Sequence, residues 1–95
     1  MGKIQKVGIP WYRPEDYPKL LGVFADADRL PATHADWLAR AEQLEQQVRA
    51  SGKRVERVYL DPDKFPAWCR ERGLDINGQA RAGYAAEVAM RHLGN

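Results

Sequence analysis

The segment KRVERVYLD, residues 53–61, is the one part of this chain that is strongly typical of a β-strand. Within residues 54–60 its large apolar and aromatic side chains are Val55, Val58, Tyr59 and Leu60. A lone strand leaves its backbone donors and acceptors unpaired, and a folded protein has to satisfy these groups. The need for a partner strand therefore constrains the fold more than any other feature.

Two partners are available to this strand. The first is residues 4–9 of the same chain, but Gly8 and the following Pro10 should limit the pairing to part of the length. The second is residues 54–60 of another copy, which would pair antiparallel across a two-fold axis and build a four-stranded sheet from two chains. The two arrangements are compatible, and the sequence leaves the choice open.

The first half of the chain also predicts two helices. Pro18 does not suit the interior of a helix that begins at Pro14, so a single turn at 14–17 should precede a helix over residues 18–25. Thr33 can then cap the clearest helix of the chain, which Gly52 can end.

The second half predicts two more helices. Asp61 should cap a helix whose inner face carries Phe65, Trp68 and Cys69. Asn77 should cap an alanine-rich helix over residues 78–93.

Residues 14–18 (PEDYP) and 62–66 (PDKFP) share the pattern Pro-acid-x-aromatic-Pro. Internal duplication would explain the match, and so would the suitability of this pattern for starting a helix. Whether or not the two halves arose by duplication, we predict an α+β fold that is mainly helical. It should have about four helices and a small two-stranded sheet, in β-α-α-β-α-α order. Residues 1–95 should form a single globular domain, and the sheet is expected to extend across a dimer.

The composition is that of a globular protein, with 44% hydrophobic and 29% charged residues among 95. No apolar run approaches the ~18 residues that cross a membrane, and the single Cys69 cannot form an internal disulfide. We therefore expect a cytoplasmic chain without membrane association. Its motifs predict neither a cofactor nor a metal site.

Three segments, GIPWYRPEDY, FADADRLPATHADWL and YLDPDKFPAWCRERGL, resemble a group of short uncharacterised bacterial proteins. The resemblance extends from about Val7 to Arg91. It implies one small domain, and it brings no activity, cofactor or catalytic residue with it.

Trp11, Tyr12 and Arg13 are candidates for contact with a partner, because aromatic residues beside arginine are typical of interface anchors. The alternative is that the two aromatic rings fold back over the first helix. Val55 and Val58 are further candidates for partner contact if the strand pairs across a dimer.

A local basic patch indicates a second class of partner. The excess of positive charge in the second half of the chain lies mostly in RASGKRVER, on Arg49, Lys53, Arg54 and Arg57. Such a patch predicts nucleic-acid binding only weakly, since no recognised binding motif accompanies it.

Asp26 and Asp28 follow the first helix, where a carboxylate opposes the helix dipole. They should organise the following turn or pair with Arg29, and binding of a cation or ligand is the alternative. Cys69 is expected to be buried rather than nucleophilic.

The predicted core contains Phe24, Trp37, Leu44, Phe65, Trp68 and Tyr84. Trp37, Ala41, Leu44 and Val48 should form the buried seam of the long helix. We therefore expect a small, non-enzymatic interaction or regulatory protein that forms a homodimer or binds another protein. The alternatives are a nucleic-acid-associated protein and a small enzyme with a site at its acidic loop.

Overall fold

The two predicted strands pair with each other within one chain. The computed structural model describes residues 5–92. Within these residues, β1 (Lys6–Trp11) and β2 (Arg54–Tyr59) form a two-stranded parallel sheet, with Lys6 opposite Arg54 and Trp11 opposite Tyr59. Parallel neighbours require a long crossover connection, and two helices supply it here.

Pro10 does not interrupt this sheet, so the prediction that Gly8 and Pro10 shorten the pairing is wrong. The N–H of Arg54 donates to the carbonyl of Gln5 at 2.8 Å, and the N–H of Leu60 donates to that of Trp11 at 3.1 Å. Backbone groups alternate between the two sides of a strand, so the odd-numbered residues of β1 point toward β2. Pro10 points the other way, and the donor it lacks belongs to the outer edge, where proline is tolerated.

The described residues contain four α-helices besides the sheet, and the predicted β-α-α-β-α-α order is confirmed. They are α1 (Tyr17–Val23), α2 (His34–Ala50), α3 (Lys64–Glu71) and α4 (Gly78–Arg91), with a 3₁₀ turn, η1 (Ala27–Arg29), between α1 and α2. None of the helices in residues 5–92 is long and apolar enough to span a membrane.

Side-chain caps explain where α2 and α4 begin, and Asp61 organises the turn that leads into α3. Thr33, Asp61 and Asn77 each accept a hydrogen bond from a backbone N–H two or three residues later, at 2.8 to 3.2 Å. Gly52 follows α2 with a φ of 90°, a left-handed conformation that favours glycine. The predicted caps at Thr33 and Asn77 and the predicted stop at Gly52 are therefore confirmed. The first helix ends at Val23 rather than at residue 25, and the last ends at Arg91, while residue 93 of its predicted range lies outside the described residues.

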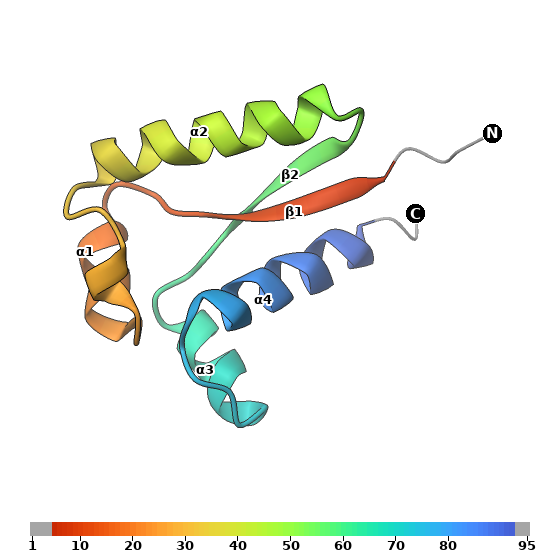
Figure 1. Cartoon of the computed structure of the whole chain (residues 1–95). Coiled ribbons are helices and arrows are strands. Elements are labelled where there is room, and N and C mark those ends of the chain that lie inside the picture. Colours follow the sequence, from red (N-terminus) through yellow and green to blue (C-terminus); the bar gives the residue numbers. More distant parts are fainter. Residues whose placement is uncertain (1–4, 93–95) are drawn as a thin grey trace.

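The sheet lies between two helices, as Figure 1 shows, with α2 over one face and α4 over the other. Trp11 faces α2, where its ring lies 5.2 Å from that of Trp37. Gly8 faces α4, and a Cβ added to it would collide with the carbonyl of Ala85. The absence of a side chain at Gly8 therefore allows the backbones of β1 and α4 to touch.

Most of the predicted core is buried. Phe24, Trp37 and Phe65 are inaccessible or nearly so, and Trp68 and Tyr84 are half-buried beside them. The rings of Phe65 and Tyr84 meet edge to face at 5.4 Å, an arrangement that aromatic pairs prefer.

Leu44 is the exception, because 49% of it is exposed and its predicted place in the core is wrong. The buried face of α2 passes through Trp37, Ala41 and Glu45, at intervals of four residues. Glu45 can occupy this position because Arg57 of β2 meets its carboxylate.

Candidate functional site

Trp11 and Tyr12 do not form an exposed recognition surface, and their burial agrees instead with the alternative in which the rings fold back. They are only 3% and 4% exposed. The ring of Tyr12 packs against those of Tyr17 and Trp37, and burial raises its pKa to about 12. Of the three predicted anchors only Arg13 is exposed, and its guanidinium lies 4.5 Å from the centre of the Tyr59 ring.

Val55 and Val58 are also held within the domain. Val58 is buried and Val55 is half-buried against the core. The register of the sheet directs the N–H of Val58 toward β1, which leaves it unavailable to a second chain.

The predicted basic patch is divided between two places. Arg49, Lys53 and Arg54 line an open hollow at the turn between α2 and β2. Arg57 lies apart from them, since its guanidinium stacks 4.1 Å from the Trp11 ring and is hydrogen-bonded to Glu45. Nucleic-acid binding by the remaining three cations stays a prediction.

The pair of Glu45 and Arg57 was not predicted. Two guanidinium N–H groups donate to the two carboxylate oxygens at 2.7 and 2.8 Å. These bonds hold the pKa of Glu45 below its usual range, although only 7% of its side chain is exposed. The sequence did contain a signal for the burial of Glu45. It lies four residues after Ala41 and eight after Trp37, which places it on the same face of the helix.

Asp26 is paired with Arg81 rather than with the predicted Arg29. Both carboxylate oxygens accept N–H groups of the guanidinium at 2.8 Å, and these bonds lower the pKa of Asp26. Asp28 is exposed. Among the described residues, no cluster of three or more acidic, histidine or cysteine side chains could hold a metal ion. Binding of a cation or ligand at this loop stays a prediction.

The remaining reactive side chains are in contact with other protein groups. Cys69 is fully buried, as predicted, and burial raises the pKa of its thiol. The Nε2 atom of His34 lies 2.7 Å from the carbonyl of Tyr12. His92, at the end of α4, contacts the carboxylate of Glu56. The burial of Cys69 and the contacts of the two histidines give each of these three side chains a structural role.

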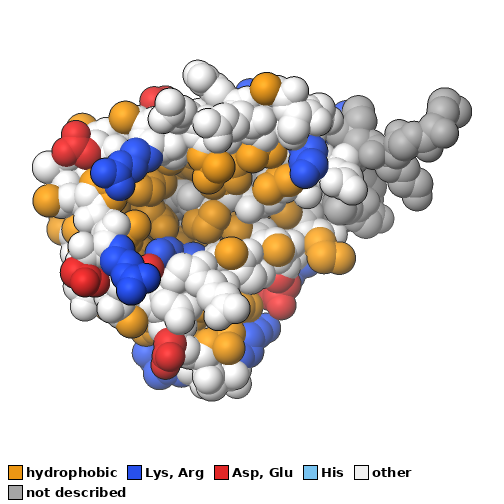
Figure 2. Space-filling view, in the orientation of Figure 1, with side chains coloured by type: hydrophobic (Ala, Val, Ile, Leu, Met, Phe, Trp, Pro, Cys, Tyr) orange, Lys and Arg blue, Asp and Glu red, His pale blue; other side chains and the backbone are white. Residues whose placement is uncertain are grey.

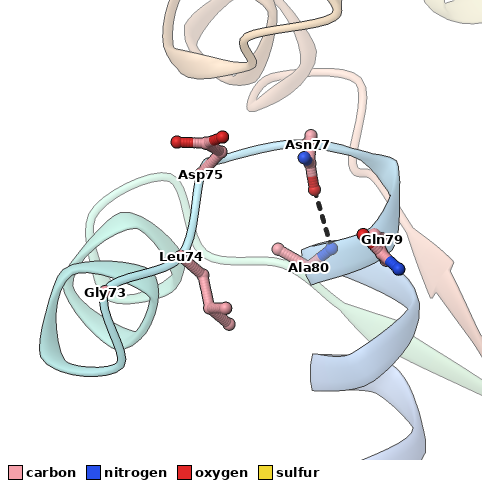
Figure 3. Close-up of a pocket in the computed structure, with 6 residues that line it drawn as sticks. All are labelled: Gly73, Leu74, Asp75, Asn77, Gln79 and Ala80. Atoms are coloured by element: carbon pink, nitrogen blue, oxygen red, sulfur yellow. Dashed lines mark hydrogen bonds between the residues drawn. The ribbon is translucent and has the colours of Figure 1, made fainter.

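Two open hollows have polar linings. The first lies at the turn between α3 and α4, where Figure 3 shows the Asn77 side chain directed back to the N–H of Ala80 as a helix cap. The second lies at the carboxyl ends of the strands and is lined in part by Arg13, His34 and Arg57. In the first hollow Asn77 is used as a helix cap, and in the second Arg13, His34 and Arg57 contact other protein groups.

The outer edge of β1 differs from these hollows, because its outward backbone groups find no partner in the described part of the chain. The N–H and C=O groups of Lys6 and Gly8, and the C=O of Pro10, point away from β2. Within residues 5–92 these groups have no hydrogen-bond partner. A charged Lys6 side chain beside this edge would discourage pairing with another chain. Its Nζ atom instead lies 2.7 Å from Glu56, in an ion pair within the domain.

Apolar side chains border this edge on the side of α2. A hollow of about 270 Å³ adjoins this edge at Pro10. Its lining is mostly apolar but includes the charged Arg40, and its members are Ile9, Pro10, Tyr12, Leu30, Pro31, Trp37, Arg40, Ala41 and Leu44. Leu44 stands at the rim, half in solvent. Figure 2 shows hydrophobic side chains on both sides of a hollowed region between α2 and α4.

The second rim belongs to α4. Tyr84 and Val88 form its half-buried flank, which accounts for the burial of Val58 on the α4 face of β2. The opposite flank carries Ala82, Ala86 and Met90, all exposed, and adjoins Ala85 and Ala89, which face Gly8 of β1. We call the backbone edge of Lys6, Gly8 and Pro10, together with Leu30, Pro31, Leu44, Ala86 and Met90, the β1-edge surface.

Comparison with known proteins extends the earlier resemblance. A family model described as a domain of unknown function (DUF8829) matches residues 12–93, which is most of the chain and includes both flanking helices. No curated protein and no solved structure matches the chain significantly. The chain therefore belongs to the DUF8829 family.

Proposed function

We propose that this chain acts by binding another polypeptide through the β1-edge surface, as a small interaction or regulatory protein rather than an enzyme. One observation carries the proposal: the outward backbone groups of β1 have no hydrogen-bond partner within residues 5–92, and this edge adjoins a mostly apolar hollow at Pro10. An extended segment can add to such an edge, with main-chain hydrogen bonds supplying affinity and flanking pockets supplying specificity.

The contrast between the two outer edges supports this assignment. Free edges promote unwanted pairing, and proteins usually place charges beside them. The outer edge of β2 follows that rule at its start, where Arg54 is exposed. The charge of Arg57 is turned toward Trp11 and Glu45 instead. The hollow beside the outer edge of β1 is lined by Leu44, 49% exposed, together with Arg40, and Met90 on α4 is 69% exposed. Apolar surface left in this position favours a partner that covers it.

Two leucines allow a matched test. Leu44 lies on the β1-edge surface, and Leu74 lies at the turn between α3 and α4 with a similar exposed fraction of 44%. Immobilised wild type, Leu44→Glu and Leu74→Glu should be compared as baits, with the retained polypeptides identified by mass spectrometry and the untagged chain itself counted among them.

We expect polypeptides that bind wild type and Leu74→Glu but not Leu44→Glu. Identical sets on all three baits would show that the β1-edge surface does not recruit a partner. Circular dichroism of the three proteins confirms that each remains folded, because both leucines are half-exposed and their replacement leaves the core intact.

A further inference from the structure

We propose that the polypeptide bound at the β1-edge surface is a second copy of this chain, with β1 of each copy pairing antiparallel across a two-fold axis. This inference rests on the proposed function and names its partner. It also replaces the dimer expected from the sequence, in which the two copies would pair through residues 54–60.

The positions of the free donors fit a register centred on Gly8. In an antiparallel pair, residues opposite each other at a hydrogen-bonded position exchange N–H and C=O groups. With Gly8 opposite Gly8 of the partner subunit, Lys6 lies opposite Pro10 of the partner subunit. Lys6 and Gly8 then both donate, while Pro10, which has no N–H, only accepts. Each outward N–H of β1 thereby finds an acceptor. The only bond that this register lacks is the one that Pro10 would donate to Lys6 of the partner subunit, so one bond is lost per chain.

The widths of the layers also fit a second copy. Two strands about 4.8 Å apart make a layer about 10 Å wide, and one helix is about 10 Å across. A sheet of four strands would therefore carry two α2 helices side by side at the usual packing distance of about 8–10 Å. Leu44 stands on the flank of α2 that would meet the second α2, which gives this exposed side chain an apolar contact.

On the other face, the small residues of α4 permit the same approach. The backbone of α4 touches β1 at Gly8, so two α4 helices would lie close together on their face of the extended sheet. Ala82 and Ala86 stand on the flank that would meet the second α4. Alanine allows two helix backbones to approach closely, whereas larger side chains on this flank would hold the copies apart. A partner that brings no helix to this face would not require alanine on the exposed flank of α4.

The molecular mass in solution tests the proposal. Light scattering after gel filtration, over a series of protein concentrations, should give twice the chain mass of 10.8 kDa for the wild type. Leu44→Glu should elute as a folded monomer, because two carboxylates would be buried against each other at the axis. Leu74→Glu should remain a dimer, as the matched control with the same change of charge.

A second measurement reports the location of the contact. Cys69 is fully buried, so a new cysteine is the accessible thiol of the folded domain. Leu44→Cys should be cross-linked between copies by a short bis-maleimide in dilute solution, and Leu74→Cys should not. Cross-linking of both variants to the same extent would indicate random encounter and overturn the arrangement.

The remaining outcomes also decide between the two proposals. A wild type that stays at 10.8 kDa throughout the series would overturn the second copy as the partner. A Leu44→Glu variant that stays dimeric would show that the copies meet elsewhere. In either case the bait comparison decides separately whether the β1-edge surface binds another protein.

Discussion

Asp26 and Arg81 stand 55 positions apart in the chain, yet the two form a bidentate ion pair with both N–O distances at 2.8 Å. The guanidinium of Arg81 also lies 4.4 Å from the centre of the Phe24 ring, and only 8% of its side chain is exposed. The pair joins the end of α1 to the start of α4. Removing one partner would leave the other charge with little solvent, which is costly.

The first prediction concerns this pair. Arg81→Met should lower the free energy of unfolding by about 3 kcal/mol, the lower end of the range for a broken buried pair, because Asp26 remains partly solvated. The double variant Asp26→Asn/Arg81→Met should lose less than the sum of the single changes. Urea denaturation measures both. Asp28→Asn is the control, since this exposed residue should change stability by less than about 0.5 kcal/mol.

The same pair predicts a dependence on pH. The pKa of Asp26 is lowered, chiefly by hydrogen bonds from Arg81, so the folded state holds its proton less tightly than the unfolded state. Its contribution to stability is complete above the ordinary aspartate pKa of about 3.9. It is lost as the pH falls through the lowered pKa of the folded state. Asp26→Asn should flatten the acid limb of stability measured by denaturation, and an unchanged limb would contradict the assignment.

The third prediction compares two arginines that contact the same carboxylate. Arg57→Ala should cost about 2–3 kcal/mol, since it leaves the buried Glu45 without its main partner. Arg49 lies 3.5 Å from the same carboxylate, but 61% of its side chain is exposed. Arg49→Ala should therefore cost about 0.5 kcal/mol or less. Equal losses of unfolding free energy for the two variants would contradict the assignment of Arg57 as the main partner of Glu45.

A fourth prediction concerns the contact of β1 with α4. Gly8→Ala should destabilise the domain by about 2–3 kcal/mol, because the added methyl group collides with the backbone carbonyl of Ala85. Gly83 lies on α4 with no atom within 4 Å of an added Cβ. Gly83→Ala should stabilise the helix by about 0.5–1 kcal/mol. Thermal unfolding of both variants provides the measurement, and opposite signs are the expected result.

The fifth prediction concerns the thiol. Cys69 is fully buried and its pKa is raised by burial, so little reactive thiolate should form in the folded protein. A thiol reagent should label the native chain slowly, at a rate that rises with urea as the domain opens. Leu74→Cys supplies an exposed thiol for comparison. Rapid labelling of Cys69 in native protein would reopen the question of a nucleophilic role.

Much of the secondary structure follows from neighbouring residues alone. Thr33, Asp61 and Asn77 act within two or three positions of themselves, so their caps are readable without knowledge of the fold. The order of strands and helices follows from these boundaries. The place of Cys69 in the core was also predictable, because apolar spacing identifies the inner face of a short helix.

The candidate site was predictable only in part. A free strand edge was expected from the shortage of strands, but it was assigned to residues 54–60 rather than to β1. The side of the strand on which Pro10 lacks a donor depends on the register with β2, and register is a property of the pair. The sequence of β1 alone cannot reveal that its proline lies harmlessly on the outer edge.

The sequence by itself determined the elements of this protein, because caps, turns and apolar periodicity act over a few residues. Tertiary structure decided which side chains those elements bury. Glu45 of α2 is buried because Arg57, on β2, neutralises its carboxylate. This pair turns the Glu45 side of α2 toward the sheet and leaves Leu44 exposed. The exposed edge of β1 has the same origin, since hydrogen bonding to β2 uses one side of the strand and leaves the other free. Such choices depend on contacts between distant residues, whose energies local sequence does not contain.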